Sequence, residues 1–186
     1  SSTDGLYVGE EAVELGDWTG PGAARTILRH PDIDVAILET ARGGILRRGL
    51  GVEGVDGALV TNISSDHLGE YGVTTLESMA EAKGVVYEVV HPQGIRVYNM
   101  DDPHVAGLSH TTESSAIWTS VAGLSSSIRD HIERGGRALY VEANELVIAE
   151  DTHRSVLMGV DDIPCAFGGT ARYNVSNALS AAAMAH

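Results

Sequence analysis

A carboxylate and an imidazole follow two short apolar runs of the sequence. Glu39 comes directly after the run Val35–Leu38, and Asp66 and His67 come a few residues after the run Ala58–Val60. Short apolar runs that end abruptly in polar residues are typical of strands buried on both faces of a parallel sheet. Open α/β sheets bind ligands beyond the carboxyl ends of their strands. The sequence therefore predicts that Glu39 and His67 lie at one edge of a sheet, where they could share a metal ion.

A lysine that is unique in the composition falls on the next predicted helix. Lys83 is the only lysine, whereas the chain contains eleven arginines. The capping-box spacing of Thr74–Glu77 predicts the start of a helix that runs to about Val90 and ends before His91-Pro92. Lys83 lies on the apolar face of this helix. A lysine at such a position usually extends its amine to solvent, so two interpretations stay open, a solvated side chain and a functional one.

The segment Ala41–Gly51 combines four glycines with three arginines and predicts a glycine-rich loop. Arg42, Arg47 and Arg48 could hold a carboxylate or a phosphate through forked hydrogen bonds. The alternative is a solvated basic loop on an acidic protein. Because the loop leaves a predicted central strand, we favour the binding role.

Helical and strand patterns alternate along the rest of the chain. They predict an α/β fold with a mostly parallel sheet flanked by helices and a peripheral β-hairpin. Strands are expected at Leu6–Val8, Glu11–Leu15, Val35–Glu39, Gly57–Ile63, Gly94–Met100, Ala116–Thr119 and Ser155–Val160, and a hairpin at Ala138–Glu150. Further helices are expected at Thr19–His30, with Thr19 as N-cap, at Val121–Arg134, and at Asn174–Met184, with Asn174 as N-cap.

Size and charge narrow the class of protein. A chain of 186 residues is long enough for one well-buried domain. Its formal charge of −14 argues against nucleic acid as a partner. No apolar run approaches the roughly 18 residues of a membrane helix. The single cysteine, Cys165, excludes an internal disulfide framework and fits the reducing cytoplasm.

Four segments resemble the sequence motifs of a known family and occur in the same order. They are LETARGGILRRGLG (Leu38–Gly51), TNISSDHLGEYG (Thr61–Gly72), ESMAEAKGVVYEVV (Glu77–Val90) and ARYNVSNALSAAA (Ala171–Ala183). Together they resemble the central, ATP-binding domain of the Mur ligase superfamily, most closely that of the cyanophycin synthetases. The resemblance covers nearly the whole chain, which makes it more specific than any single motif.

The resemblance implies a reaction and its participants. In this family ATP phosphorylates a carboxylate, and the amine of an incoming amino acid attacks the acyl phosphate to form an amide. The implied cofactors are ATP and Mg²⁺. The implied partners are a carboxylate acceptor (a peptide or a polymer), an amino acid substrate and the rest of the ligase polypeptide, with no nucleic acid and no membrane.

The same resemblance assigns roles to individual residues. Glu39 and His67 match the magnesium ligands of the family, and Lys83 matches a lysine that many Mur ligases carry as a carbamate. A carbamate is a carboxylate, so it can bind a metal ion that an ammonium group would repel. The remaining matches are Asn174 and Asn177, which match asparagines near the adenine, and Arg42, which is assigned to the carboxylate substrate. For Asn174, a helix cap remains the alternative.

The sequence also departs from the family pattern. The Walker-type turn that ends in Gly-Lys-Thr has no counterpart, and its place in the family precedes Ser1. We therefore expect residues 1–186 to form a single Mur ligase central-type domain of P-loop type that lacks the first strand and the phosphate loop. Such a domain would be a fragment of a longer ligase and inactive alone. Gly69 and Tyr71 replace an aspartate and a histidine of the peptidoglycan-type ligases, which favours the cyanophycin synthetase branch.

Two other functions remain as alternatives. The chain could be a catalytically degenerate binding or interaction module with the same fold. It could also be a metal-dependent hydrolase that uses Glu39, Asp66 and His67. The hydrolase would need further ligands, and His91, His104 and His110 lie in predicted loops without ligand spacing.

Overall fold

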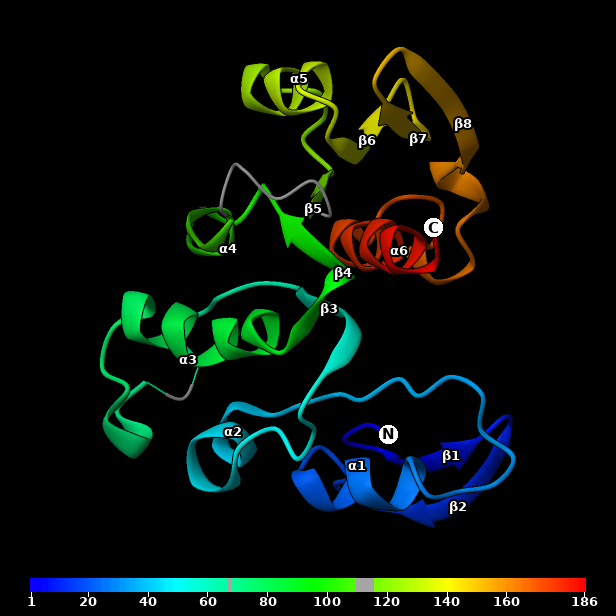
Figure 1. Ribbon diagram of the computed structural model, residues 1–186. Coiled ribbons are helices and arrows are strands. Elements are labelled where there is room, and N and C mark those ends of the chain that lie inside the picture. Colours follow the sequence, from blue (N-terminus) through cyan, green and yellow to red (C-terminus); the bar gives the residue numbers. More distant parts are fainter. Residues whose placement is uncertain (67, 110–115) are drawn as a thin grey trace.

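A six-stranded sheet lies at the centre of the computed structural model, which describes residues 1–66, 68–109 and 116–186 (Figure 1). Its strands are adjacent in chain order: β3 (Val55–Val60), β4 (Val90–Asn99), β5 (Ala116–Ser120), β6 (Arg137–Glu142), β7 (Glu145–Glu150) and β8 (His153–Gly159). The pairs from β3 to β6 are parallel, and β7 and β8 are antiparallel. The predicted α/β fold with a mostly parallel sheet and a hairpin is confirmed.

Both faces of the sheet are covered by helices. Side chains alternate between the faces along each strand, and both sets are apolar, so each face must be buried. One face packs against α3 (Leu76–Glu88), α4 (Pro103–Leu108) and α5 (Ser126–Glu133), and the other packs against α6 (Arg172–Ala185). The first face carries the aromatic residues Tyr98, Trp118 and Tyr140, and the second carries the aliphatic residues Val97, Ile117 and Leu139. In the described part of the chain, no helix has the length and hydropathy to cross a bilayer.

The N-terminal quarter forms a smaller unit beside the sheet. It consists of the hairpin β1 (Gly5–Val8) and β2 (Glu11–Leu15), followed by α1 (Pro21–Ile27) and α2 (Arg42–Arg48). The unit has its own small core around Leu6, Ala23 and Ile27. It lies below α3 and the sheet in Figure 1, coloured blue to cyan.

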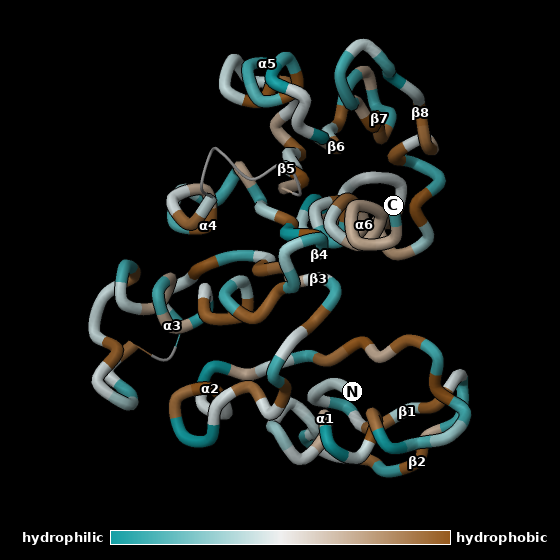
Figure 2. Tube along the Cα trace, viewed as in Figure 1, coloured by the Kyte–Doolittle hydropathy of each residue, from teal (hydrophilic) through white to brown (hydrophobic). Residues whose placement is uncertain are grey.

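The predicted strand Val35–Glu39 is not a strand. The segment is largely hydrophobic (Figure 2). Val35 and Ile37 are 80% and 82% exposed, while Ala36 and Leu38 pack on the small core. The backbone of this extended segment pairs with Ser1, whose amine donates to the Ile37 carbonyl at 2.8 Å. The run is apolar throughout, but only one of its sides is covered, so the prediction of burial on both faces was wrong.

Three other local predictions need correction. The predicted glycine-rich loop contains the helix α2, whose C-cap residue Gly49 has a left-handed φ of 73°. The N-cap of α1 is Gly20, because the Thr19 side chain donates to Asp17 instead. The capping box of α3 forms one residue later than its spacing suggests, between Thr75 and Ser78.

Candidate functional site

The loop Thr61–Ile63, which follows β3, is held through three successive backbone groups. Asn99 Nδ2 donates to the carbonyl of its first residue at 2.8 Å, and Lys83 Nζ donates to the carbonyl of its second at 3.1 Å. The N–H of its third residue donates to Asp102 Oδ2 at 2.7 Å. Side chains from α3 and from the end of β4 therefore fix the loop, and this is the preorganisation that a binding site requires.

Lys83 reaches this loop from α3, on the side of the helix that faces the sheet edge. Its side chain is half-buried, and burial lowers the pKa of the amine below its ordinary value. The charges of Asp102 and Asp66 oppose this lowering, and the charge of Arg42 adds to it. Of the two interpretations of Lys83, a freely solvated side chain does not fit an amine bonded to the loop.

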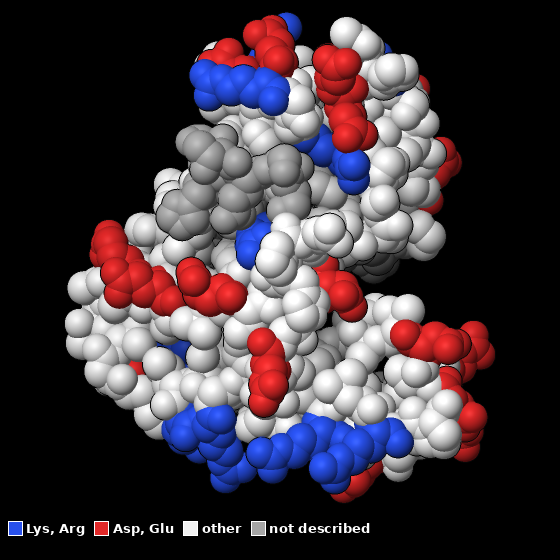
Figure 3. Space-filling model, viewed as in Figure 1, with Lys and Arg blue, Asp and Glu red and all other residues white. Residues whose placement is uncertain are grey.

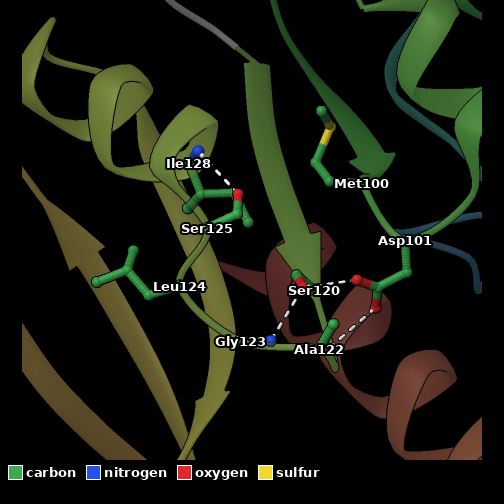
Figure 4. Close-up of a pocket in the computed structure, with 8 residues that line it drawn as sticks. All are labelled: Met100, Asp101, Ser120, Ala122, Gly123, Leu124, Ser125 and Ile128. Carbon is green, nitrogen blue, oxygen red and sulfur yellow. Dashed lines mark hydrogen bonds between the residues drawn. The ribbon is translucent and has the colours of Figure 1, made fainter.

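Two consecutive aspartates connect the end of β4 to both of its neighbours. Asp102 Oδ1 accepts from the N–H groups of His104 and Val105 and so caps α4, while its other oxygen holds the loop after β3. Asp101 accepts from the Val121 N–H at 2.6 Å and from Ser120 Oγ at 2.6 Å, and Figure 4 draws the second of these bonds. The sequence patterns predict no role for this pair. The two aspartates follow the predicted strand Gly94–Met100 directly, and this position was the signal that could have identified them.

A cavity of about 440 Å³ opens beside Asp101, at the carboxyl ends of β4 and β5. Met100, Leu124 and Ile128 form its apolar wall, and Ser120 and Ser125 contribute hydroxyl groups (Figure 4). The carboxylate of Asp101 is already engaged by donors of the protein. It therefore shapes the cavity rather than offering a free acceptor to a ligand.

Arg42 is buried between α2 and the turn that follows the Thr61–Ile63 loop. Its Nη2 lies 2.9 Å from Glu70 Oε2, and its guanidinium lies 5.9 Å from the centre of the Tyr71 ring. Arg47 approaches the same ring at 5.3 Å. Tyr71 has a left-handed backbone with φ of 54°, a costly conformation that is often found at functional sites. Arg42 and Lys83 thus both contact the connection between β3 and α3, Arg42 at the turn and Lys83 at the loop before it.

Asn174 and Asn177 lie three residues apart on α6. Asn174 Nδ2 donates to the carbonyl of Cys165 at 2.6 Å, and the residue lies inside the helix, whose N-cap is Ala171. The predicted cap is therefore wrong. Asn177 is exposed. The start of α6 contacts the loop after β5, because Arg172 Nη2 donates to the Val121 carbonyl at 3.4 Å.

The predicted metal ligands are only partly described. Glu39 is exposed, and its Oε2 accepts from the Thr3 N–H at 3.2 Å, whereas His67 lies outside the described residues. Among the residues that the structure describes, no group of three His, Cys, Asp or Glu could hold a metal ion. Mg²⁺ commonly binds through one or two carboxylates, water and phosphate oxygens, so Glu39 fits this ion as a single hard ligand. The described residues lend no support to the cluster that a metal hydrolase would need.

The sequence profile of the Mur ligase middle domain matches residues 10–185. The chain belongs to this family. The Thr61–Ile63 loop, the lysine of α3 and the two asparagines of α6 all lie within the matched residues. Within this Mur ligase middle domain, the loop Thr61–Ile63 lies at the carboxyl end of β3, held by the three hydrogen bonds described above.

Several characterised proteins are similar to this Mur ligase domain. A cyanophycin synthetase of Nostoc sp. is 42% identical over 97% of this chain and 20% of its own length, and one of Synechocystis sp. is 41% identical over 97% and 21%. A UDP-N-acetylmuramoyl-L-alanyl-D-glutamate–2,6-diaminopimelate ligase of Chlamydia pneumoniae is 27% identical over 82% and 29%. The solved structure of a pseudomurein peptide ligase type C from Methanothermus fervidus aligns with a TM-score of 0.42 and 20% identity, over 71% of this chain and 31% of that chain. The chain spans about a fifth of the length of the cyanophycin synthetases that it matches.

Proposed function

We propose that this chain is the ATP-binding central part of an ATP-dependent ligase that joins a carboxylate to an amine. The observation that carries the proposal is the attachment of Lys83 to the anchored loop Thr61–Ile63, within a Mur ligase middle domain. Similarity to the cyanophycin synthetases over nearly the whole chain supports the same class of reaction. The participants would be a carboxylate acceptor (a peptide or polymer), an amino acid and the remainder of a longer cytoplasmic polypeptide.

Each predicted site residue has a chemical task in this proposal. Asn177 would donate to and accept from the edge of the adenine, because a side-chain amide can do both. Asn174 would support it by holding the turn at Cys165. Glu39 and His67 would hold Mg²⁺, which when bound neutralises charge on phosphate oxygens.

Lys83 and Arg42 would act on the carboxylate side of the site. The lowered pKa of Lys83 increases the uncharged fraction of the amine, which is the form that takes up CO₂ to become a carbamate. A carbamate keeps one N–H, so it can keep the bond to the Asn62 carbonyl. Arg42 would orient the carboxylate substrate through its forked N–H groups, with Glu70 holding the guanidinium in place.

We also propose that these 186 residues alone do not complete the reaction. Lys83, the only lysine, follows Ala82, so the sequence holds no Gly-Lys-Thr turn to bind the β- and γ-phosphates. The acyl phosphate step requires those phosphates to be held in place.

Calorimetric titration with Mg²⁺-ATP tests the proposal. We would compare the chain, its Asn177→Ala variant and a longer polypeptide of the length of the cyanophycin synthetases. We expect the longer polypeptide to bind ATP and to form an amide. Asn177→Ala introduced into it should weaken binding about tenfold, a typical effect of losing one hydrogen bond to a ligand. Failure of the longer polypeptide to bind ATP would contradict the proposal and favour the degenerate binding module. Amide formation by the chain alone would contradict only the expectation that it is inactive.

A further inference from the structure

Exposed arginines gather on one face of the small N-terminal unit. Figure 3 shows a band of Lys and Arg along the lower edge of the molecule, over α1 and α2. The exposed arginines of these helices and of the turn after α1 are Arg25, Arg29, Arg47 and Arg48. The chain as a whole carries a formal charge of −14, so this face is a local reversal of sign. We call these four residues the arginine face.

Acidic residues are absent from the sequence segments that build the arginine face. Segments 18–31 and 40–52 contain five arginines and no Asp or Glu, in a chain that has 26 acidic residues. The two segments are in close contact at Gly51 and Pro21. A side chain at position 51 would not fit, since its Cβ would lie only 2.5 Å from Pro21 Cβ. Local separation of charge of this kind creates a positive potential despite the net charge, since solvent screens distant carboxylates within about 10 Å.

No carboxylate of the described residues pairs with the guanidinium groups of the arginine face, although Arg47 Nε donates to the Gly43 carbonyl at 2.9 Å. Arg42, Arg137 and Arg154, in contrast, do form ion pairs with carboxylates. The carboxylate of Asp32, which follows α1, lies 4.0 Å from His30 Nδ1.

Exposed leucines accompany the arginines. Leu28 precedes Arg29 and is 57% exposed, and Leu46 precedes Arg47 and is 39% exposed. Arginine beside apolar side chains is typical of surfaces that bind polypeptides. Nucleic-acid phosphates would make no use of the leucines. The face is also short, because two helices of seven residues each extend only about 10 Å, against about 34 Å for one turn of DNA.

We propose that the arginine face binds a short polypeptide segment that carries several carboxylates and at least one apolar side chain. Forked guanidinium groups bind carboxylates with two parallel hydrogen bonds, which a lysine ammonium cannot do. The leucines would cover the apolar side chain of the segment. This inference does not depend on the proposed ligase function, because it concerns a different set of residues.

Binding of a labelled peptide by fluorescence anisotropy tests the inference. The probe is a peptide of about twelve residues with alternating Glu and Leu, which is long enough to cross both helices. The control peptide has Gln in place of each Glu. We expect the chain to bind the Glu peptide and not the Gln peptide, and to lose about tenfold in affinity between low salt and about 0.2 M salt. Substitution of all four arginines by Gln should weaken binding by about tenfold or more.

Two variants keep the test specific. Arg129→Gln with Arg134→Gln removes two exposed arginines, one in α5 and one at its C-cap, which adjoin Asp130 and Glu133 in the sequence, and should leave peptide binding unchanged. Arg25→Gln, Arg29→Gln and Arg48→Gln together spare Arg47, which contacts Tyr71, and should still weaken binding. Circular dichroism checks that each variant is folded. Absence of binding, equal loss in the α5 variant, or tighter binding of a short DNA duplex through the same arginines would overturn the inference.

Discussion

Asp102 Oδ2 accepts a hydrogen bond from the backbone N–H of Ile63 at 2.7 Å, across 39 positions of the sequence. The contact arises because β3 and β4 are parallel neighbours, so the residues that follow them emerge at the same edge of the sheet. The other carboxylate oxygen caps α4. One side chain therefore couples the start of a helix to the loop that also receives Lys83.

Removal of the Asp102 carboxylate should destabilise the chain through two separate losses. Asp102→Ala leaves the first turn of α4 without its cap and the buried N–H of Ile63 without an acceptor. We expect a loss of about 2–4 kcal/mol in the free energy of unfolding, measured with urea. Asp102→Asn keeps one acceptor oxygen and should cost about 1 kcal/mol. Equal losses in the two variants would show that the hydrogen bonds are not the cause.

Carbamate formation at Lys83 can be observed directly. In the presence of ¹³C-bicarbonate, we expect a carbamate resonance that is absent from Lys83→Arg, because arginine does not take up CO₂ at its guanidinium group. Lys83 is the only lysine, so the N-terminal amine is the one other candidate amine, and its resonance should persist in the variant. Identical spectra for the two proteins would exclude the carbamate at Lys83.

His131 should make the chain less stable as the pH falls below neutral. The ring stacks on Trp118 at 4.1 Å, and burial lowers its pKa below the ordinary 6.5, although a hydrogen bond with the Arg137 carbonyl opposes this. Below pH 6.5 the unfolded chain then binds more protons than the folded chain, so stability decreases with decreasing pH until the folded pKa is passed.

The variant His131→Phe tests this dependence, because it keeps an aromatic ring against Trp118 and removes the titration. We expect the free energy of unfolding of His131→Phe to change less than that of the parent chain between neutral pH and about pH 5. Carboxylates whose pKa is lowered, such as Glu77 and Glu150, titrate below this range. Parallel pH profiles for the two proteins would assign the acid sensitivity to other groups.

The turn between β6 and β7 offers a stabilising substitution. Ala143 and Asn144 have φ values of 49° and 65°, the left-handed pair of a type I′ hairpin turn. Asparagine tolerates this conformation better than alanine, so Ala143→Asn should raise the free energy of unfolding by about 0.5–1 kcal/mol. Ala143→Val places a β-branched residue there and should lower it. A rise in stability with valine would contradict the argument.

Much of the fold is encoded by patterns among near neighbours in the sequence. Short apolar runs bounded by turn residues predicted β3 to β6, and the hairpin at Ala138–Glu150 was correct because two apolar runs surround a turn that can become left-handed. The capping residues of α3 and the spacing of its apolar face predicted the helix that carries Lys83. Such patterns are reliable because turn geometry and side-chain periodicity depend on residues only a few positions apart.

Other features depended on which distant segments meet. Val35 and Ile37 have the composition of a buried strand but are exposed. Arg42 lies in a helix whose Gly44 sits beside Thr19 and Gly20, the residues before α1. The sequence marked Lys83 as unusual but could not show that its amine meets the Asn62 carbonyl, or that Asp102 holds Ile63. Burial and long-range hydrogen bonds are properties of packing between elements, and no local pattern specifies which backbone group will lie opposite a given side chain.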